Sequence, residues 1–302
     1  MEPTRTHNRV RGFHSTRCKN PNPSYAVPEN HRKRLAFVRD LVTASQSRDV
    51  TRSDEAMLAR CQGERQKHFY KDRANAINAL HSVFSEHVNL VTFQIEISLR
   101  NASDAAGLST TSEAELKRAK EDPTHTPVVS ISRASRAFKD MVAMGWIVAK
   151  DEWQVWDKEA GCWIDKYYEA TPLFFNACGV TTERLMRQQS TRLGYLKDQA
   201  LRSGKTPAEV GRMSITQIKA ERQLQWRKRA FERRGKEHAR KKAVRALHGK
   251  DRAEQRKVAQ RRVLDALTPF EAKTIDQQTF KEMVNKEIAM LRKFADISPP
   301  IH

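Results

Sequence analysis

The residues best suited to chemistry in this sequence are cationic side chains on a short segment that begins at Ser130. From Ile131 onward, apolar side chains recur at helical spacing and polar ones fall on the opposite side, which predicts an amphipathic helix with a cationic outer face. The guanidinium groups of Arg133 and Arg136 are planar and can bind a guanine edge through two hydrogen bonds. We therefore predict a helix that reads DNA, although an ordinary solvated surface helix has the same pattern. Ser130 is expected to cap this helix and touch phosphate, and three further polar side chains to position the DNA backbone: Ser132, Ser135 and Lys139.

The elements around this helix favour the interpretation as a DNA-reading helix. In chain order they are a helix at 74–84, a strand at 90–95, a helix at 98–106, an inserted polar stretch at 109–129, the cationic helix, and a hairpin with strands at 146–156 and 162–168. This order is typical of a winged helix, in which the third helix enters the major groove and the hairpin, or wing, lies beside it. Three hairpin lysines are expected to contact phosphate: Lys150, Lys158 and Lys166.

The charge of the chain points to an anionic partner and is unevenly distributed. The 302 residues include 56 Lys and Arg against 36 Asp and Glu, a formal net charge of +20. Residues 86–180 carry −4, whereas residues 181–302 carry +16. Nucleic acid suits this excess better than a membrane surface, because the apolar positions of the basic region are sparse and interrupted. We expect a sequence-independent grip on DNA from its clustered cations: Arg227, Lys228, Arg229, Arg233, Arg234, Arg240, Lys241 and Lys242.

The predicted fold class is mainly α with a small β-hairpin wing, in three parts. Residues 1–30 are expected to be a flexible basic arm, because their prolines disfavour a helix. Residues 31–180 would form the winged-helix DNA-binding domain with a preceding helix at 31–43, and the sequence leaves open whether 31–68 belongs to its core. Residues 181–302 would form a basic, mostly helical region, with helices at 182–203, 215–248, 250–267 and 277–294.

Several function classes are not supported by the sequence. The four cysteines are scattered and the ten histidines contain no closely spaced pair of metal ligands, so we predict no catalytic site, metal or cofactor. Tyr167 and Tyr168 invite comparison with a nuclease nucleophile, but they lie in the expected returning strand. Four tryptophans near the hairpin are expected to pack against the core rather than stack on bases. No apolar run is long enough to span a membrane and no apolar leader is present, so a cytoplasmic protein is expected.

Several motifs carry a resemblance to a known family. They are Lys19-Asn-Pro-Asn-Pro23, the run from Ser130 to Ala137, the Gly145-Trp-Ile turn, Gly161-Cys162 and the segment 171–175. The chain resembles the replication initiator (RepA) family of IncFII-type plasmids over residues 17–290, and most strongly between 128 and 180. The resemblance implies a plasmid-encoded protein that binds double-stranded origin DNA, works with the host initiator DnaA and the replicative helicase, and is not itself a nuclease.

Two other classes stay open at this point. A winged-helix transcriptional regulator would share the central domain, and an architectural nucleic-acid-binding protein would account for the basic region alone. The oligomeric state and the DNA site are not given by the sequence.

Overall fold

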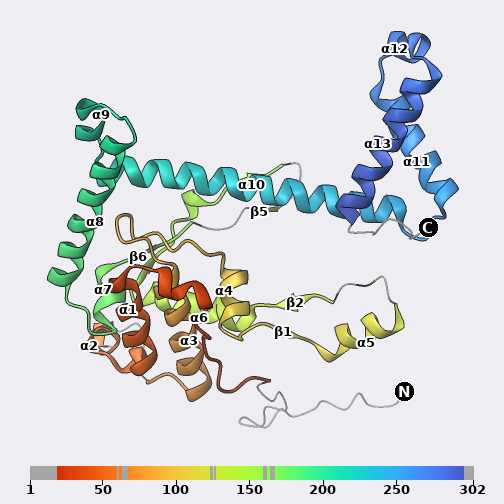
Figure 1. Ribbon diagram of the computed structural model, residues 1–302. Coiled ribbons are helices and arrows are strands. Elements are labelled where there is room, and N and C mark those ends of the chain that lie inside the picture. Colours follow the sequence, from red (N-terminus) through yellow and green to blue (C-terminus); the bar gives the residue numbers. More distant parts are fainter. Residues whose placement is uncertain are drawn as a thin grey trace, which may run out of the picture. The chain divides into compact units, whose positions relative to one another are not determined.

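The computed structural model describes residues 19–59, 61–62, 67–122, 125, 127–158, 162–163 and 167–295 (Figure 1). They form two compact units, which we call the first unit and the second unit. The first unit takes its residues from 1–154 and 165–223, and the second from 155–164 and 224–302. The boundary predicted at residue 180 differs from this division, because the helix that follows residue 180 packs on the first unit: its Leu185 lies fully buried in that core.

The first unit is mainly helical, and most of the predicted helices are present in the predicted order. Its described helices are α1 (Ala36–Ser47), α2 (Asp54–Ala59), α3 (Lys71–His87), α4 (Leu99–Ala105), α5 (Glu113–Glu121), α6 (Ser132–Ala143), α7 (Pro172–Asn176), α8 (Thr182–Arg202), α9 (Pro207–Gly211) and the first turns of α10 (Ile215–Leu247). Short 3₁₀ turns lie at Glu29–Lys33, Val50–Arg52 and Asp151–Trp153.

The core of the first unit is built around α3, whose apolar residues recur at helical spacing as predicted. Ile77, Leu80 and Phe84 are fully buried, and α3 packs against α1 on one side and against α4 and α6 on the other. His81, also fully buried, packs inside this core rather than facing solvent. Burial of this apolar face, at about 25 cal/mol per Å², is the main stabilising contribution to the arrangement of the three helices α3, α4 and α6.

The described strands pair as three two-stranded antiparallel sheets. β1 (Thr110–Thr111) pairs with β2 (Val129–Ser130), β3 (Ile147–Val148) with β6 (Glu169–Ala170), and β4 (Trp156–Asp157) with β5 (Cys162–Trp163). A hairpin therefore occupies the predicted place, but its returning strand meets β3 at 169–170, later than the expected 162–168. The β1–β2 ribbon closes the inserted stretch predicted at 109–129, which contains the exposed helix α5.

The predicted strand at 90–95 is wrong, because a side chain closes a tight turn there. The Asn89 carboxamide oxygen accepts hydrogen bonds from the backbone N–H groups of Val91 and Thr92, at 3.0 and 3.2 Å. Such local bonds compete with a strand ladder. Only single bridges remain, including the one between Gln94 and Glu169, which places residues 93–95 beside β6.

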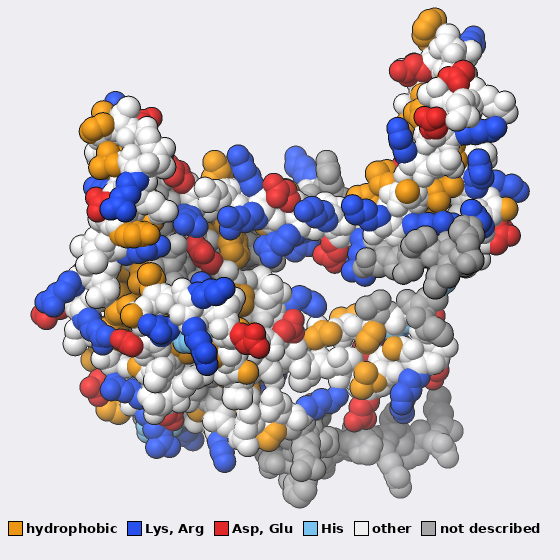
Figure 2. Space-filling model, in the orientation of Figure 1, with side chains coloured by type: hydrophobic (Ala, Val, Ile, Leu, Met, Phe, Trp, Pro, Cys, Tyr) orange, Lys and Arg blue, Asp and Glu red, His pale blue; other side chains and the backbone are white. Residues whose placement is uncertain are grey.

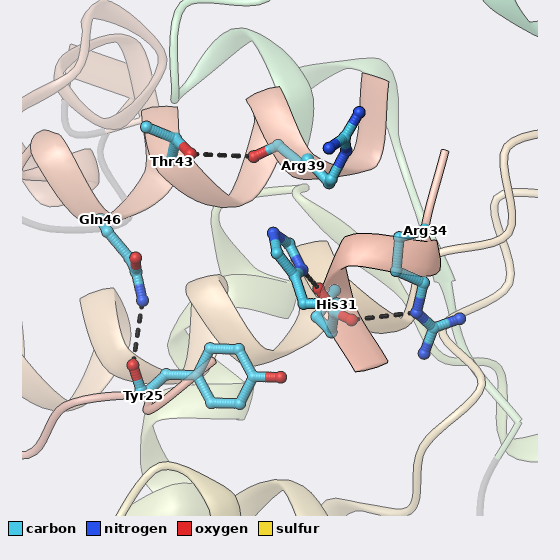
Figure 3. Close-up of polar contacts among 7 residues, drawn as sticks. Tyr25, His31, Arg34, Arg39, Thr43 and Gln46 are labelled. Carbon is cyan, nitrogen blue, oxygen red and sulfur yellow. Dashed lines mark hydrogen bonds and ion pairs between the residues drawn. The ribbon is translucent and has the colours of Figure 1, made fainter. Parts of the chain in front are cut away.

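The first described residues also differ from the expectation. The helix predicted at 31–43 begins at Ala36, after the 3₁₀ turn, because Arg34 and Leu35 have extended ψ angles of 160° and 141°. Figure 3 shows the contacts of the 3₁₀ turn that precedes α1. His31 Nδ1 lies 2.5 Å from the carboxylate of Glu86, and Arg34 Nε lies 2.9 Å from it. The Glu86 side chain is completely buried. Of the flexible arm predicted at 1–30, residues 1–18 lie outside the described residues, and residues 19–30 lie on the unit with Tyr25 buried in its core.

The second unit combines the β4–β5 pair with the rest of α10 and three further helices. These are α11 (Arg252–Ala266), α12 (Pro269–Thr274) and α13 (Gln277–Ala295). α11 and α13 pack around Ala259, Val263 and Val284, and an ion pair of 3.2 Å joins Arg262 to Glu287. The predicted helices at 215–248, 250–267 and 277–294 are confirmed, and α12 is additional. Among the helices that the structure describes, none is both long and apolar enough to cross a bilayer.

Candidate nucleic-acid interface

The amphipathic helix predicted from Ile131 onward is confirmed as α6. Its predicted role in reading DNA stays a prediction. Ala134, Ala137 and Met141 are fully buried against the neighbouring helices of the core. The helix ends before Gly145, whose φ of +70° is a left-handed conformation that glycine adopts without strain. This packing turns the polar side of α6 outward.

Ser130 does not cap this helix, contrary to the prediction. It lies in β2 and pairs with Thr110, so that the residue at the cap position is Ile131, which offers no side-chain acceptor. The Ser130 hydroxyl instead accepts a hydrogen bond from the Ser132 N–H at 3.3 Å. The β1–β2 ribbon thus leads straight into α6 and sets where it begins.

Three of the predicted contact residues form one exposed row on α6. Ser132, Arg136 and Lys139 are exposed and are spaced four and three residues apart, which places them on the same face. Arg136 Nε donates to the Ser132 carbonyl oxygen at 3.3 Å, so its guanidinium lies along the exposed helix surface. Ser135 is half-buried beside this row. We call Ser132, Arg136 and Lys139 the cationic row.

Arg133 does not belong to the cationic row. It is half-buried, and its guanidinium donates to two backbone carbonyl oxygens, that of Asn20 and that of Asp72, the latter at 3.1 Å. These two bonds engage terminal N–H groups of the guanidinium inside the unit. The structure therefore gives Arg133 an internal contact, and its base contact stays a prediction.

The three predicted hairpin lysines have different surroundings. Lys150 is exposed, lies 3.3 Å from the carboxylate of Glu152 and 5.6 Å from the ring centroid of Trp153. Its charge is therefore partly balanced locally. Lys158 is exposed on the second unit. Lys166 lies outside the described residues.

The aromatic residues near the hairpin mostly pack inward. Trp146 is completely buried, as predicted, whereas Trp156 is about half exposed. Tyr167 and Tyr168 are both buried, and the Tyr168 hydroxyl donates to the Ile97 carbonyl oxygen. Burial, reinforced by the neighbouring Glu169 carboxylate, raises the pKa of Tyr167 well above its ordinary value. The Tyr167 phenol therefore stays protonated, which does not suit a nucleophile.

The basic part of α10 presents most of its predicted contact residues to solvent. Figure 2 shows Lys and Arg side chains along α10 on the face in view, whereas Trp226, Ala230 and Ala243 are buried. The Arg233 guanidinium lies 5.7 Å from the Trp226 ring centroid, and Lys241 pairs with Glu237 at 2.9 Å. Arg227 and Arg234 are half-buried, and six cations are exposed: Lys228, Arg229, Arg233, Arg240, Lys241 and Lys242.

Two groups of cations with definite positions were not predicted from the sequence. At the start of α10, Lys219 lies 2.7 Å from Glu169 of β6 and Arg222 lies 3.4 Å from Glu96, which attaches this end of α10 to the first unit. Between α11 and α13 a groove of about 700 Å³ is lined by four cations: Arg252, Arg256, Arg292 and Lys293. The excess of Lys and Arg in the sequence predicts that residues 181–302 are basic, but it does not predict which residues these cations contact. Within the described ranges, no group of three or more His, Cys, Asp and Glu side chains is placed to hold a metal ion.

Comparison with known proteins identifies the family of the chain. The IncFII RepA protein family matches residues 13–296. The "Probable replication-associated protein repA1" of Buchnera aphidicola subsp. Acyrthosiphon pisum (strain APS) is 28% identical over 293 residues, which cover 93% of this chain and 96% of that protein. A "Replication initiation protein" of Escherichia coli is 26% identical over 214 residues, 68% of this chain and 61% of that protein. No solved structure matches the chain. Because the family match spans nearly the whole chain, the chain belongs to the IncFII RepA protein family, a family of plasmid replication initiation proteins.

Proposed function

We propose that this protein starts plasmid replication by binding origin DNA sequence-specifically through a winged helix in its first unit. The observation that carries this proposal is the cationic row on α6: Ser132, Arg136 and Lys139 are exposed together on a helix whose opposite side is buried. A short helix that presents guanidinium and ammonium groups on one face fits the width of the major groove.

The arrangement around α6 supports a winged helix. α3, α4 and α6 pack together, and residues 93–95, β6 and β3 lie side by side in that order, since Gln94 bridges Glu169 and β6 pairs with β3. Three helices followed by a hairpin whose base joins a third extended segment is the architecture expected of this fold. The β1–β2 ribbon with α5 is an insertion between the second and third helices.

We propose a division of labour between base contacts and phosphate contacts. Residues 86–180 carry a net charge of −4, so α6 is not held on DNA by the net charge of its surroundings. Base-edge contacts specify sequence, whereas phosphate contacts supply most of the salt-dependent affinity. The exposed cations of α10 are suited to the second task. If they engage six to ten phosphates, affinity falls by about 10³- to 10⁵-fold between 50 and 200 mM salt.

The protein would then act by binding and recruitment rather than by catalysis. Its sequence contains neither of the glycine-rich phosphate-binding motifs, G-x-x-x-x-G-K-[ST] and G-x-G-x-x-G. Opening of the duplex would therefore draw on binding free energy or on the ATPase of a partner. The partners that the family resemblance implies are the host initiator DnaA and the replicative helicase.

The test is a footprint of the full-length protein on the DNA that flanks its gene. We expect protection of a region outside the promoter, and a plasmid that carries this region should be maintained when the gene is supplied. Protection confined to the promoter would instead indicate a transcriptional regulator. The absence of any preferred site would indicate an architectural protein, and either result would contradict the proposal.

A further inference from the structure

A short segment at the N-terminal side, Lys19–Tyr25, makes hydrogen bonds to several elements of the first unit. We call it the strap. It has no regular secondary structure, so its backbone carbonyls can accept hydrogen bonds from other elements. Besides a bond from α6, its described hydrogen bonds include four to other parts of the unit: Lys19 Nζ to the Thr111 carbonyl of β1, Asn20 Nδ2 to the Gly107 carbonyl after α4, Asn75 Nδ2 of α3 to the Pro21 carbonyl, and Gln46 Nε2 of α1 to the Tyr25 carbonyl.

The strap is anchored at its far end by Tyr25. This side chain is buried in the main core of the unit, and the Gln46 bond to its carbonyl, 2.9 Å long, holds the backbone at the same point (Figure 3). Burial, followed by the charge of Glu86, raises the pKa of Tyr25 to about 12, so the phenol stays neutral there. The strap therefore has a fixed position and does not move freely over the surface.

The strap contacts the proposed DNA-reading helix through the side chain of Arg133. The guanidinium donates through Nη1 to the Asn20 carbonyl oxygen of the strap and through Nη2 to the Asp72 carbonyl oxygen of α3, at 3.1 Å. The several N–H donors of a guanidinium form a rigid, planar fork, so one side chain can hold two acceptors at a fixed angle, which the flexible ammonium of lysine does not do. Arg133 thus joins α6 to two elements at once.

We propose that Arg133 is a positioning residue for DNA recognition: through the carbonyls of Asn20 and Asp72 it sets the orientation at which α6 presents Arg136 to a base pair and Lys139 to the DNA backbone. This inference rests on the proposed function of α6. It makes sequence discrimination depend on the strap, which lies more than 100 residues away in the chain and outside the winged helix itself. A shift of a few tenths of an ångström in a recognition helix weakens bidentate hydrogen bonds, whose geometry is strict.

The experiment compares full-length variants at position 133 for the ratio of cognate to scrambled DNA affinity. Arg133→Met removes both hydrogen bonds but keeps an unbranched side chain, and we expect the ratio to fall about tenfold, which lies within the range for a weakened bidentate base contact. The slope of log affinity against log salt should not change, since no phosphate contact is lost. Arg133→Lys should recover part of this ratio, because the lysine ammonium can donate a hydrogen bond to one of the two carbonyls. Arg39→Met, on an exposed arginine of α1, is the matched control and should leave both quantities unchanged.

A second variant tests the connection through the strap. Asn75→Ala removes the bond of 3.0 Å between α3 and the Pro21 carbonyl and so loosens the strap without altering α6. If both residues act through one contact, the double variant should lose little more discrimination than Arg133→Met alone. Limited proteolysis within residues 19–25 should become faster in both single variants, which reports loosening directly even if the melting temperature changes.

Three results would overturn the inference. A salt slope lower by about one in Arg133→Met would show a phosphate contact, and relaxed preference at a single base pair would show base readout. An unchanged ratio would show that the bonds to the strap are irrelevant to recognition. These results are distinguishable from failure of the proposed function, because in that case Arg136→Ala would also leave the ratio unchanged.

Discussion

At the scale of single residues, buried polar groups hold the core of the first unit in one arrangement. The imidazole of His81 is completely enclosed and lies stacked on Phe174, with ring centroids 4.0 Å apart. Its Nε2 donates to the Phe174 carbonyl oxygen at 2.9 Å, and its Nδ1 accepts from the Ser45 hydroxyl at 2.7 Å. Both ring nitrogens are satisfied in the neutral imidazole, and burial lowers the pKa of His81 to about 4.

This environment predicts that the folded protein loses stability in mild acid. The pKa of His81 is lower in the folded than in the unfolded chain, where it is about 6.5, so unfolding takes up a proton between these values. The stability is complete above pH 6.5 and falls as pH decreases toward 4, by up to about 1.4 kcal/mol per pH unit. Urea unfolding of the wild type and of His81→Gln between pH 7 and 4.5 measures this. The variant should show the smaller slope, and equal slopes would contradict the assignment.

The residues of the candidate interface show what a sequence can and cannot predict at this scale. The buried side of α6 follows from helical spacing alone, and Ala134, Phe138 and Met141 lie inside as expected. Arg133 and Arg136 could not be told apart, since both fall on the polar arc. What separates them is a pair of backbone carbonyls from the strap and α3, and no local pattern reveals partners so distant in the chain.

At the scale of elements, the long helix α10 contains one weak point. Gly235 lies in its interior, with no atom within 4 Å of the place where a Cβ would stand. Gly235→Ala should therefore stabilise this part of the helix by about 1 kcal/mol without a clash. Hydrogen exchange of the amides around residue 235 should slow about fivefold, the factor that this free energy corresponds to. Unchanged exchange would mean that the helix is already held there by other contacts.

Helices were predicted well and strands poorly, for physical reasons. Helix ends depend on neighbouring residues, such as Ser98, Thr181 and Thr206, whose side chains accept hydrogen bonds from the first turn. Strand pairing depends on distant residues. The partner of β3 is β6, not the nearer residues 162–168. In place of the strand predicted at 90–95, the chain forms a turn that the Asn89 side chain closes.

At the scale of the whole molecule, the two units carry different parts of the proposed task. The cationic row lies on the first unit, and the exposed cations of α10 from residue 227 onward lie on the second. The sequence placed the boundary before the helix at 182, whereas the first unit extends to residue 223. Ion pairs of Lys219 and Arg222 with Glu169 and Glu96 explain this difference. A truncation that spares the first unit must therefore end after residue 223.

The division of labour predicts a change in salt dependence without a change in sequence preference. Replacing four exposed cations of α10 by glutamine should lower the slope of log affinity against log salt by up to about four, because each lost phosphate contact contributes about 0.9. The cations are Lys228, Arg229, Arg240 and Lys242. Filter binding or anisotropy at several salt concentrations measures the slope. If the slope stayed the same while the cognate-to-scrambled ratio fell, α10 would be reading sequence and the assignment of tasks would be reversed.

The most direct test of DNA reading by α6 is the ratio of cognate to scrambled affinity for full-length Arg136→Ala. Loss of a bidentate contact with a base removes about 1–3 kcal/mol of discrimination, so we expect the ratio to fall by about 5- to 150-fold with the folded structure intact. Lys139→Ala, which would remove a backbone contact, should weaken both DNA molecules nearly equally. A ratio for Arg136→Ala equal to that of the wild type would contradict the proposal that α6 recognises the origin.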